Sequence, residues 1–178
     1  DIAGLVKGAS RGEGLGNKFL ANIRETDAIV HVVRCFDDEN VIHVEGSTDP
    51  RRDIDIINME LVMADLEMVQ RRVEKAAKAL KGDKKFQHEV DVFSALQKHL
   101  GNLARTFSCD EDDAALIATS DLLTLKPVIY AANTDEAGFA DLEHNQYYQQ
   151  VKAIADAEDS QVLPICAKME QDIAELEG

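Results

Sequence analysis

Four consecutive residues, Asn133-Thr134-Asp135-Glu136, directly follow an apolar run, and their side chains could hydrogen-bond a purine base. Proteins that read guanine in this way usually place Lys and Asp where this chain has Thr134 and Glu136. Asp accepts from guanine N1–H and the 2-amino group, whereas adenine presents an acceptor at N1 and repels a carboxylate held there. Asn133 can donate to adenine N7 and accept from its 6-amino group. These residues alone modestly favour adenine, and a polar turn after a strand is the alternative.

A second pattern, Asp1-x-x-Gly4, opens the chain and leads into a glycine-rich segment. An Asp in this pattern can hold a water on Mg²⁺ while the Gly N–H faces a γ-phosphate. The short pattern is common, and by itself it also fits a flexible loop before a helix. The glycines at 12–16, with Asp37 about twenty residues further on, suggest a dinucleotide-binding fold instead. No strand precedes those glycines, however, and that fold leaves residues 133–168 unexplained.

Basic residues gather near the middle of the chain, although its formal net charge is −15. The acidic total disfavours general binding to nucleic acid or to an anionic membrane, but a local cluster can still contact phosphates. Such a cluster fits a solvated helix face as well as an RNA contact. Its members are Arg71, Arg72, Lys75, Lys78, Lys81, Lys84 and Lys85.

The histidine and cysteine residues are not placed for catalysis. His31 and Cys35 lie in the apolar run 28–36, which favours core positions, and His43 has no acidic or nucleophilic partner at motif spacing. The three cysteines form no C-x-x-C motif, which predicts reduced thiols and a cytoplasmic location. No apolar run approaches the roughly 20 residues that span a bilayer, so we expect no membrane partner.

Short apolar runs rich in β-branched residues must position these motifs. They predict buried parallel strands at 28–36, 127–132 and 161–167. Helical patterns occur at 17–25, 111–125, 144–157 and 169–177. Strands that alternate with helices predict an α/β fold with a parallel sheet.

Between the first two strands, apolar residues recur at spacings of three and four, as in a heptad seam. Asp49 and Pro50 supply an N-cap and a first helical residue, and the seam continues to Leu80. At 1.5 Å per residue this helix would be roughly 40 Å long, too long for a simple crossover. The KGDKK sequence at 81–85 interrupts the seam, which then resumes as far as Phe107. The pattern predicts an inserted arm, an antiparallel helical hairpin whose seam is its own core.

The order of the motifs matches that of the translation-factor class of P-loop nucleotide hydrolases. Asp-x-x-Gly comes first, then a strand, then a strand ending in Asn-x-x-Glu, then one ending in Cys-Ala-Lys. The stretches DIAGLVKGASRGEGLGNKFLANIRETDAIVHVVRCF and HVEGSTDPRRDIDIINMEL closely resemble the Obg-like ATPase (YchF) family. The resemblance covers nearly the whole chain, including the inserted arm. It implies an Mg²⁺-dependent, ribosome-associated ATP hydrolase whose arm contacts the ribosome or ribosomal RNA.

The resemblance also implies roles for individual residues. Asp1 would bind Mg²⁺ through water, and Leu5 stands where related enzymes place a catalytic Gln. A leucine cannot orient water, so no catalytic residue is assigned and slow intrinsic turnover is expected. The backbone of Ala167 would line the base, and Lys168 would lie along the base or ribose. The residues expected to bind the nucleotide are Gly4, Asn133, Thr134, Glu136, Ala167 and Lys168.

One departure from the family is that no G-x-x-x-x-G-K-[ST] loop occurs in the 178 residues. In the family that loop precedes the DIAGLV stretch, so we expect a fragment that does not hydrolyse ATP alone. Two alternatives remain, a GTP-hydrolysing Obg-type protein and a non-enzymatic coiled-coil module on a degenerate nucleotide fold. The expected domains are part of a nucleotide-binding domain at 1–48, the helical arm at 49–107, and the rest of the nucleotide-binding domain at 108–178.

Overall fold

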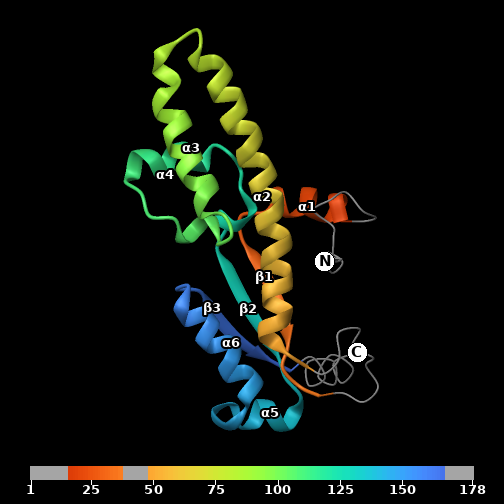
Figure 1. Ribbon diagram of the computed structural model, residues 1–178. Coiled ribbons are helices and arrows are strands. Elements are labelled where there is room, and N and C mark those ends of the chain that lie inside the picture. Colours follow the sequence, from red (N-terminus) through yellow and green to blue (C-terminus); the bar gives the residue numbers. More distant parts are fainter. Residues whose placement is uncertain (1–15, 38–47, 167–178) are drawn as a thin grey trace. The chain divides into compact units, whose positions relative to one another are not determined.

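A computed structural model describes residues 16–37 and 48–166, and its strands form one parallel sheet (Figure 1). The strands are β1 (Ile29–Arg34), β2 (Val128–Asn133) and β3 (Gln161–Ile165), hydrogen-bonded in the order β1-β2-β3. The central strand, β2, pairs in parallel with both neighbours. The three apolar runs thus form strands close to their predicted bounds, and the predicted α/β fold class is confirmed.

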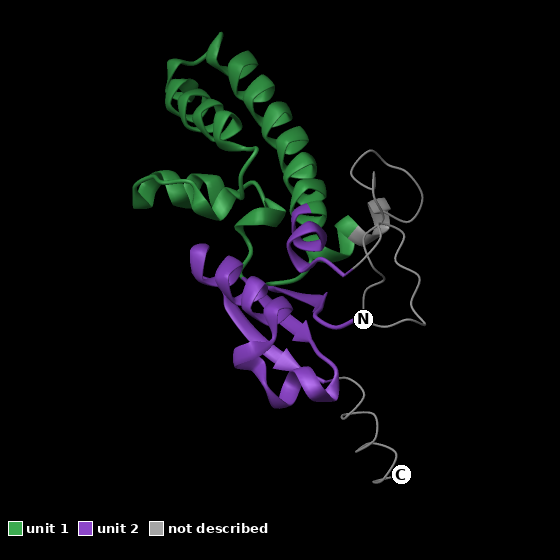
Figure 2. Ribbon diagram, turned by 60° about the horizontal axis from the view of Figure 1, so that its bottom comes forward, with its two compact units in different colours: residues 1–27, 56–127 green, residues 28–55, 128–178 purple. Residues whose placement is uncertain are grey.

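The chain divides into two compact units (Figure 2). The arm unit comprises residues 1–27 and 56–127, and the sheet unit comprises residues 28–55 and 128–178. The boundary at residue 55 falls inside α2 (Pro50–Leu80), so the start of this helix belongs to the sheet unit. The division predicted from the sequence concerns which segments bind the nucleotide, and it stays a prediction.

In the arm unit, α2 and α3 (Gln87–His99) form the predicted antiparallel hairpin (Figure 1). The α2 helix begins as predicted, since Pro50 is its first residue and the Asp49 carboxylate accepts from the Arg52 N–H at 3.1 Å. Between the two helices, a 3₁₀ turn at Lys84–Phe86 is capped by the Asp83 carboxylate. The core contains apolar residues from both helices: Val62, Val69, Val92, Phe93, Leu96 and Leu100.

The second half of the arm unit is less regular than the sequence predicts. The α3 helix ends at His99 rather than near Phe107, because the His99 carbonyl accepts from the N–H groups of Gly101 and Asn102 in a tight turn. The predicted helix at 111–125 is also shorter. The helix α4 (Glu111–Ala118) stops before Asp121, whose φ of 53° is incompatible with a continuing helix.

A buried carboxylate fixes the chain beyond Asp121. The Asp65 side chain on α2 is fully buried and accepts from the Leu123 and Thr124 N–H groups at 2.7 and 2.8 Å. It also accepts from the Thr124 hydroxyl at 2.5 Å, and that hydroxyl oxygen accepts from the Ala104 N–H at 2.8 Å. One side chain of α2 therefore anchors two segments that sequence periodicity does not connect.

The helix α1 (Gly16–Arg24) also belongs to the arm unit. Its carboxyl end is closed by the Lys126 ammonium, which donates to the Arg24 carbonyl at 3.3 Å and to the Thr26 carbonyl. A cation at this end of a helix is favoured, because the last carbonyls carry partial negative charge. These contacts tie α1 to the end of the arm unit's second segment, about one hundred residues away in sequence.

In the sheet unit, α6 (Gln146–Ala157) packs on one face of the sheet through Val151 and Ala155. That face presents Val33, Tyr130 and Ala132 to the core. The short helix α5 (Glu136–Ala140) precedes α6 and follows the end of β2.

The opposite face of the sheet corrects one prediction. The strands were expected to be buried on both faces, yet Val30, Val32 and Leu163 are 62%, 59% and 53% exposed. The strand register places Val32 and Leu163 on the face opposite α6, on either side of Ala131. Within the described part of the sheet unit, no helix buries these three side chains. The alternation typical of a half-exposed sheet results.

No helix in the described ranges combines the length and the apolar character needed to cross a membrane.

Candidate functional site

The carboxyl ends of the three strands lie side by side in the sheet unit (Figure 1). Arg34, Asn133 and Ile165 are paired in register across the sheet. Beyond them, the Cys35 N–H donates to the Asn133 carbonyl at 2.7 Å, and the Thr134 N–H donates to the Ile165 carbonyl at 2.8 Å. The predicted base-binding residues 133–136 therefore adjoin the end of the strand that leads into the predicted Cys-Ala-Lys motif.

Thr134 is buried at this edge of the sheet, with 2% of its surface exposed. Its hydroxyl donates to the Ile165 carbonyl at 2.9 Å, the same oxygen that receives its N–H. The carbonyl at the end of β3 thus takes both hydrogen-bond donors of Thr134. The predicted contact between Thr134 and a nucleotide stays a prediction.

The two acids of the motif have different surroundings. The Asp135 carboxylate caps α5, accepting from the Gly138 N–H at 2.8 Å, and the Asp135 carbonyl accepts from the Phe139 N–H at 2.9 Å. Glu136 is the first residue of α5 and is exposed. Both acids are therefore exposed, and only Asp135 is engaged by the helix cap. An Asp three residues before a Gly, at the start of a helix, is a signal that sequence reasoning could have used.

Gly138 has a steric reason to be glycine. A Cβ atom at this position would lie 2.8 Å from Asp135 Oδ1 and 2.7 Å from Asn145 Nδ2. Both neighbours are helix caps, since the Asn145 side chain accepts from the Tyr148 N–H at the start of α6. Any side chain at position 138 would collide with the two capping side chains, so at least one of them would have to move.

A carboxylate also follows β1 near the same edge of the sheet. Asp37 accepts from the Tyr147 hydroxyl on α6, with both carboxylate oxygens 2.9 Å from it. This hydrogen bond raises the pKa of Tyr147, because a neighbouring carboxylate favours the protonated phenol. Asp37 was the acidic residue on which the dinucleotide alternative rested, and its hydrogen-bond partner in the structure is Tyr147. The pairing joins positions 110 residues apart, so no local pattern could have revealed it.

Several predicted site residues lie outside the described ranges, and their roles stay predictions. Within the described ranges, no group of three or more His, Cys, Asp or Glu side chains is arranged to hold a metal ion. The predicted Mg²⁺ ligand is among the residues not described. The site residues concerned are Asp1, Gly4, Ala167 and Lys168. Leu5 and His43, which were given no role, also lie outside the described ranges.

His31 and Cys35 have the surroundings of core residues. Burial lowers the pKa of His31 to about 4, and its ring lies 5.6 Å from the ring of Tyr130. Burial raises the pKa of the Cys35 thiol to about 12. At neutral pH the imidazole is therefore uncharged and the thiol is protonated, so His31 is not a cation and Cys35 is not a thiolate.

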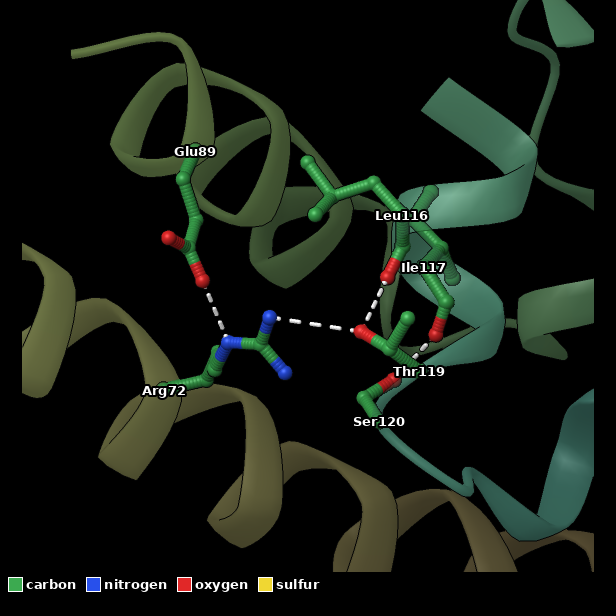
Figure 3. Close-up of polar contacts among 6 residues, drawn as sticks. All are labelled: Arg72, Glu89, Leu116, Ile117, Thr119 and Ser120. Carbon is green, nitrogen blue, oxygen red and sulfur yellow. Dashed lines mark hydrogen bonds and ion pairs between the residues drawn. The ribbon is translucent and has the colours of Figure 1, made fainter. Parts of the chain in front are cut away.

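The predicted basic cluster of the arm divides into two kinds of residue. Arg72 is half-buried and contacts α3 and the residue that follows α4 (Figure 3). Its Nε donates to the Glu89 carboxylate on α3 at 2.5 Å, and its Nη2 donates to the Thr119 hydroxyl after α4 at 3.3 Å. Its guanidinium carbon also lies 4.7 Å from the centre of the Phe93 ring. The remaining six basic side chains are exposed: Arg71, Lys75, Lys78, Lys81, Lys84 and Lys85.

Comparison with known proteins finds close relatives along the whole chain. A Pasteurella multocida protein named ribosome-binding ATPase YchF is 48% identical over 180 aligned positions, which cover 99% of this chain and 49% of that protein. A Bacillus subtilis protein of the same name is 45% identical, covering all of this chain and 50% of the relative. The chain therefore spans about half the length of the curated relatives it matches. No protein-family model matches it.

One solved structure is also similar. The structure of the Schizosaccharomyces pombe YchF GTPase matches 96% of this chain and 48% of its own chain, with a TM-score of 0.80 and 34% identity. The match covers both the parallel sheet and the helical arm, since it extends over nearly every residue. The shared arrangement is thus that of the corresponding half of a YchF protein.

Proposed function

We propose that the chain, as a member of the YchF family, is part of an ATP hydrolase that binds the ribosome. The chain corresponds to about half of a YchF protein. One observation carries the proposal. A chain 45–48% identical to proteins named ribosome-binding ATPases places its Asn-x-x-Glu residues at the carboxyl ends of a parallel sheet. Ligands of open α/β sheets bind outside those ends.

The choice of adenine rests on the chemistry of two side chains. Asn133 ends β2 and can offer both a donor and an acceptor to N7 and the 6-amino group of adenine. Glu136 is exposed on the first turn of α5 and is one methylene longer than the Asp that reads guanine. The longer side chain need not hold its carboxylate against adenine N1, an acceptor that would repel it.

Hydrolysis would need groups that residues 16–37 and 48–166 do not supply. Asp1 would hold Mg²⁺ through water, and Gly4 would lie near the γ-phosphate. The chain lacks a G-x-x-x-x-G-K-[ST] loop, whose backbone N–H groups, lysine and following helix bind phosphates. We infer that turnover requires a longer protein containing this segment, and that the 178 residues alone are inactive.

The exposed basic residues of the arm are the proposed contact with the ribosome. Arg71, Lys75 and Lys78 project from α2 at helical spacings of four and three, and three lysines follow near the turn. Phosphate contacts by such side chains dominate affinity for RNA. On a chain of net charge −15, this local excess of positive charge supports a specific contact there.

GTP is the second candidate substrate, favoured by the similarity to a structure described as a GTPase. Calorimetry of the full-length protein with Mg·ATP and Mg·GTP separates the two nucleotides. We expect tighter ATP binding, and we expect Glu136→Asp to shift the ratio of affinities toward GTP. Equal or tighter binding of GTP by the unmodified protein would overturn the adenine assignment.

A further inference from the structure

Thr134 connects the two strand ends that are proposed to recognise the base. It directly follows Asn133, and its hydroxyl and N–H both donate to the Ile165 carbonyl, at 2.9 and 2.8 Å. Ile165 is the last residue of β3, immediately before the Cys166-Ala167-Lys168 sequence. These bonds therefore join one proposed recognition segment to the start of the other.

We propose that Thr134 is a positioning residue, which fixes the spacing between the Asn133–Glu136 segment and the carboxyl end of β3 without touching the base. The inference rests on the proposed function, since it concerns how the same site recognises its nucleotide. A side chain that is 2% exposed, with its one hydroxyl donor already engaged, has little surface left for a ligand. Its contribution to affinity must then act through the residues it holds.

The segment is fixed at its other end by an independent set of contacts. The Asp135 carboxylate caps α5 through the Gly138 N–H, and the space beside Gly138 is filled by the Asp135 and Asn145 side chains. Thr134 thus anchors the segment to β3, while Asp135 anchors it to α5. Glu136 follows these two anchored residues and remains exposed, so its position relative to Asn133 is set by both anchors.

This arrangement also predicts which substitutions alter base selectivity. A lysine at position 134 cannot keep its charged end within a site that buries a threonine, because an unpaired buried ammonium is strongly unfavourable. Thr134→Lys should therefore break the link to Ile165 rather than add a base contact. Selectivity between adenine and guanine then depends on Asn133 and Glu136, and Thr134 sets how well both are held.

The test compares two ligands on the full-length protein, Mg·ATP and Mg·tripolyphosphate, which lacks the base and ribose. Thr134→Val removes the hydroxyl at nearly constant size, and Thr134→Ser keeps it. Loss of one hydrogen bond should weaken ATP binding by about three- to tenfold in the valine variant, with tripolyphosphate affinity unchanged. The serine variant should bind both ligands like the unmodified protein. Thr106→Val, which removes an exposed hydroxyl from the arm unit, is the matched control.

Two results would overturn the inference while leaving the proposed function intact. The first is unchanged ATP affinity in Thr134→Val, and the second is an equal loss of affinity for ATP and for tripolyphosphate. If the valine variant does not fold, Thr134→Ala removes the same hydroxyl without the added methyl group and is read in the same way. If the unmodified protein bound ATP no better than tripolyphosphate, base recognition itself would be absent. The proposed function and this inference would then both fail.

Discussion

The arm unit and the sheet unit each bury an ionisable side chain, but the two side chains have different surroundings. Asp65 in the arm unit is fully buried and accepts three hydrogen bonds from Leu123 and Thr124. His31 in the sheet unit is 9% exposed and packs its ring against Tyr130. The first is a polar anchor between distant segments, and the second is an imidazole kept neutral by burial. The stability of the arm unit therefore depends on the Asp65 carboxylate as a hydrogen-bond acceptor. The stability of the sheet unit depends on His31 remaining uncharged.

The largest expected effect is removal of the arm's anchor. Asp65→Ala would leave two N–H groups and one hydroxyl buried without their acceptor, which should lower the free energy of unfolding by about 3–5 kcal/mol. Urea unfolding measures the loss, and hydrogen exchange should show it over residues 104–125. Glu67→Ala, on an exposed position of the same helix, is the control. If the two variants unfold at the same urea concentration, the anchor is not needed and the comparison fails.

The next effect should appear in the sheet unit on acidification. Burial lowers the pKa of His31 to about 4, below its value of 6.5 in an unfolded chain. The unfolded state therefore binds the proton more readily, so stability is complete above pH 6.5 and falls as pH drops toward 4. The total loss attributable to His31 is about 3 kcal/mol. Unfolding followed between pH 7 and pH 4.5 measures it, and His31→Phe should remove most of the dependence. An unchanged slope in that variant would assign the acid sensitivity to other groups.

The third prediction contrasts two neighbouring arginines of the arm. Changing Arg71, Lys75 and Lys78 together to Gln should reduce the slope of log affinity against log salt for the proposed ribosome binding by about two to three. Arg72→Gln should leave that slope unchanged and instead reduce arm stability by about 1–2 kcal/mol, because it removes contacts to Glu89 and Thr119. Binding by the full-length protein at several salt concentrations checks both statements. A shallower slope for Arg72→Gln would place that residue in the proposed RNA contact.

The smallest effect concerns His88, whose pKa is shifted in the opposite direction to that of His31. A hydrogen bond with Asp113 at 2.7 Å raises the pKa of His88, whose side chain is exposed. A raised pKa means that this contact stabilises the fold below pH 6.5 and is lost as pH rises through the folded-state pKa. NMR titration should place the His88 midpoint above 6.5 and the His31 midpoint well below it. His88 titrating at its ordinary value would indicate that α3 and α4 are not joined there.

Sequence patterns predicted the parts of the fold that depend on local spacing. The seam of apolar residues predicted the helical arm, and Asp49-Pro50 predicted the start of α2. The apolar runs gave the strands, but the same runs could not reveal that Val30 and Val32 are exposed. A run of apolar residues shows the same sequence pattern whether or not another element covers it. Exposure depends on which helices pack on each face, and that is a tertiary property.

For the candidate site, the sequence predicted which residues to consider but not how their side chains are held. The order of the motifs predicts a base contact at Asn133 and Glu136, which stays a prediction, and the structure shows Asn133 paired with Ile165 across the parallel strands. Burial of Thr134 and engagement of Arg72 were not foreseen, because their partners are 31 and 17 residues away. Both side chains are polar, and polar side chains are also common at positions exposed to solvent. Only the folded contacts distinguish a side chain available to a ligand from one that holds the structure together.

The distribution of the cysteines has a practical consequence for attaching probes. Cys35 and Cys166 are buried, and Cys109 is exposed just before α4. A thiol-reactive fluorophore or spin label should therefore modify the native chain at a single position in the arm unit, with no cysteine to be replaced first. Partial desolvation and the carboxylates of Asp113 and Asp110 raise the pKa of Cys109, which keeps less of it as the reactive thiolate. Coupling should proceed slowly at neutral pH and faster in mildly alkaline buffer, giving a defined reporter of arm motion.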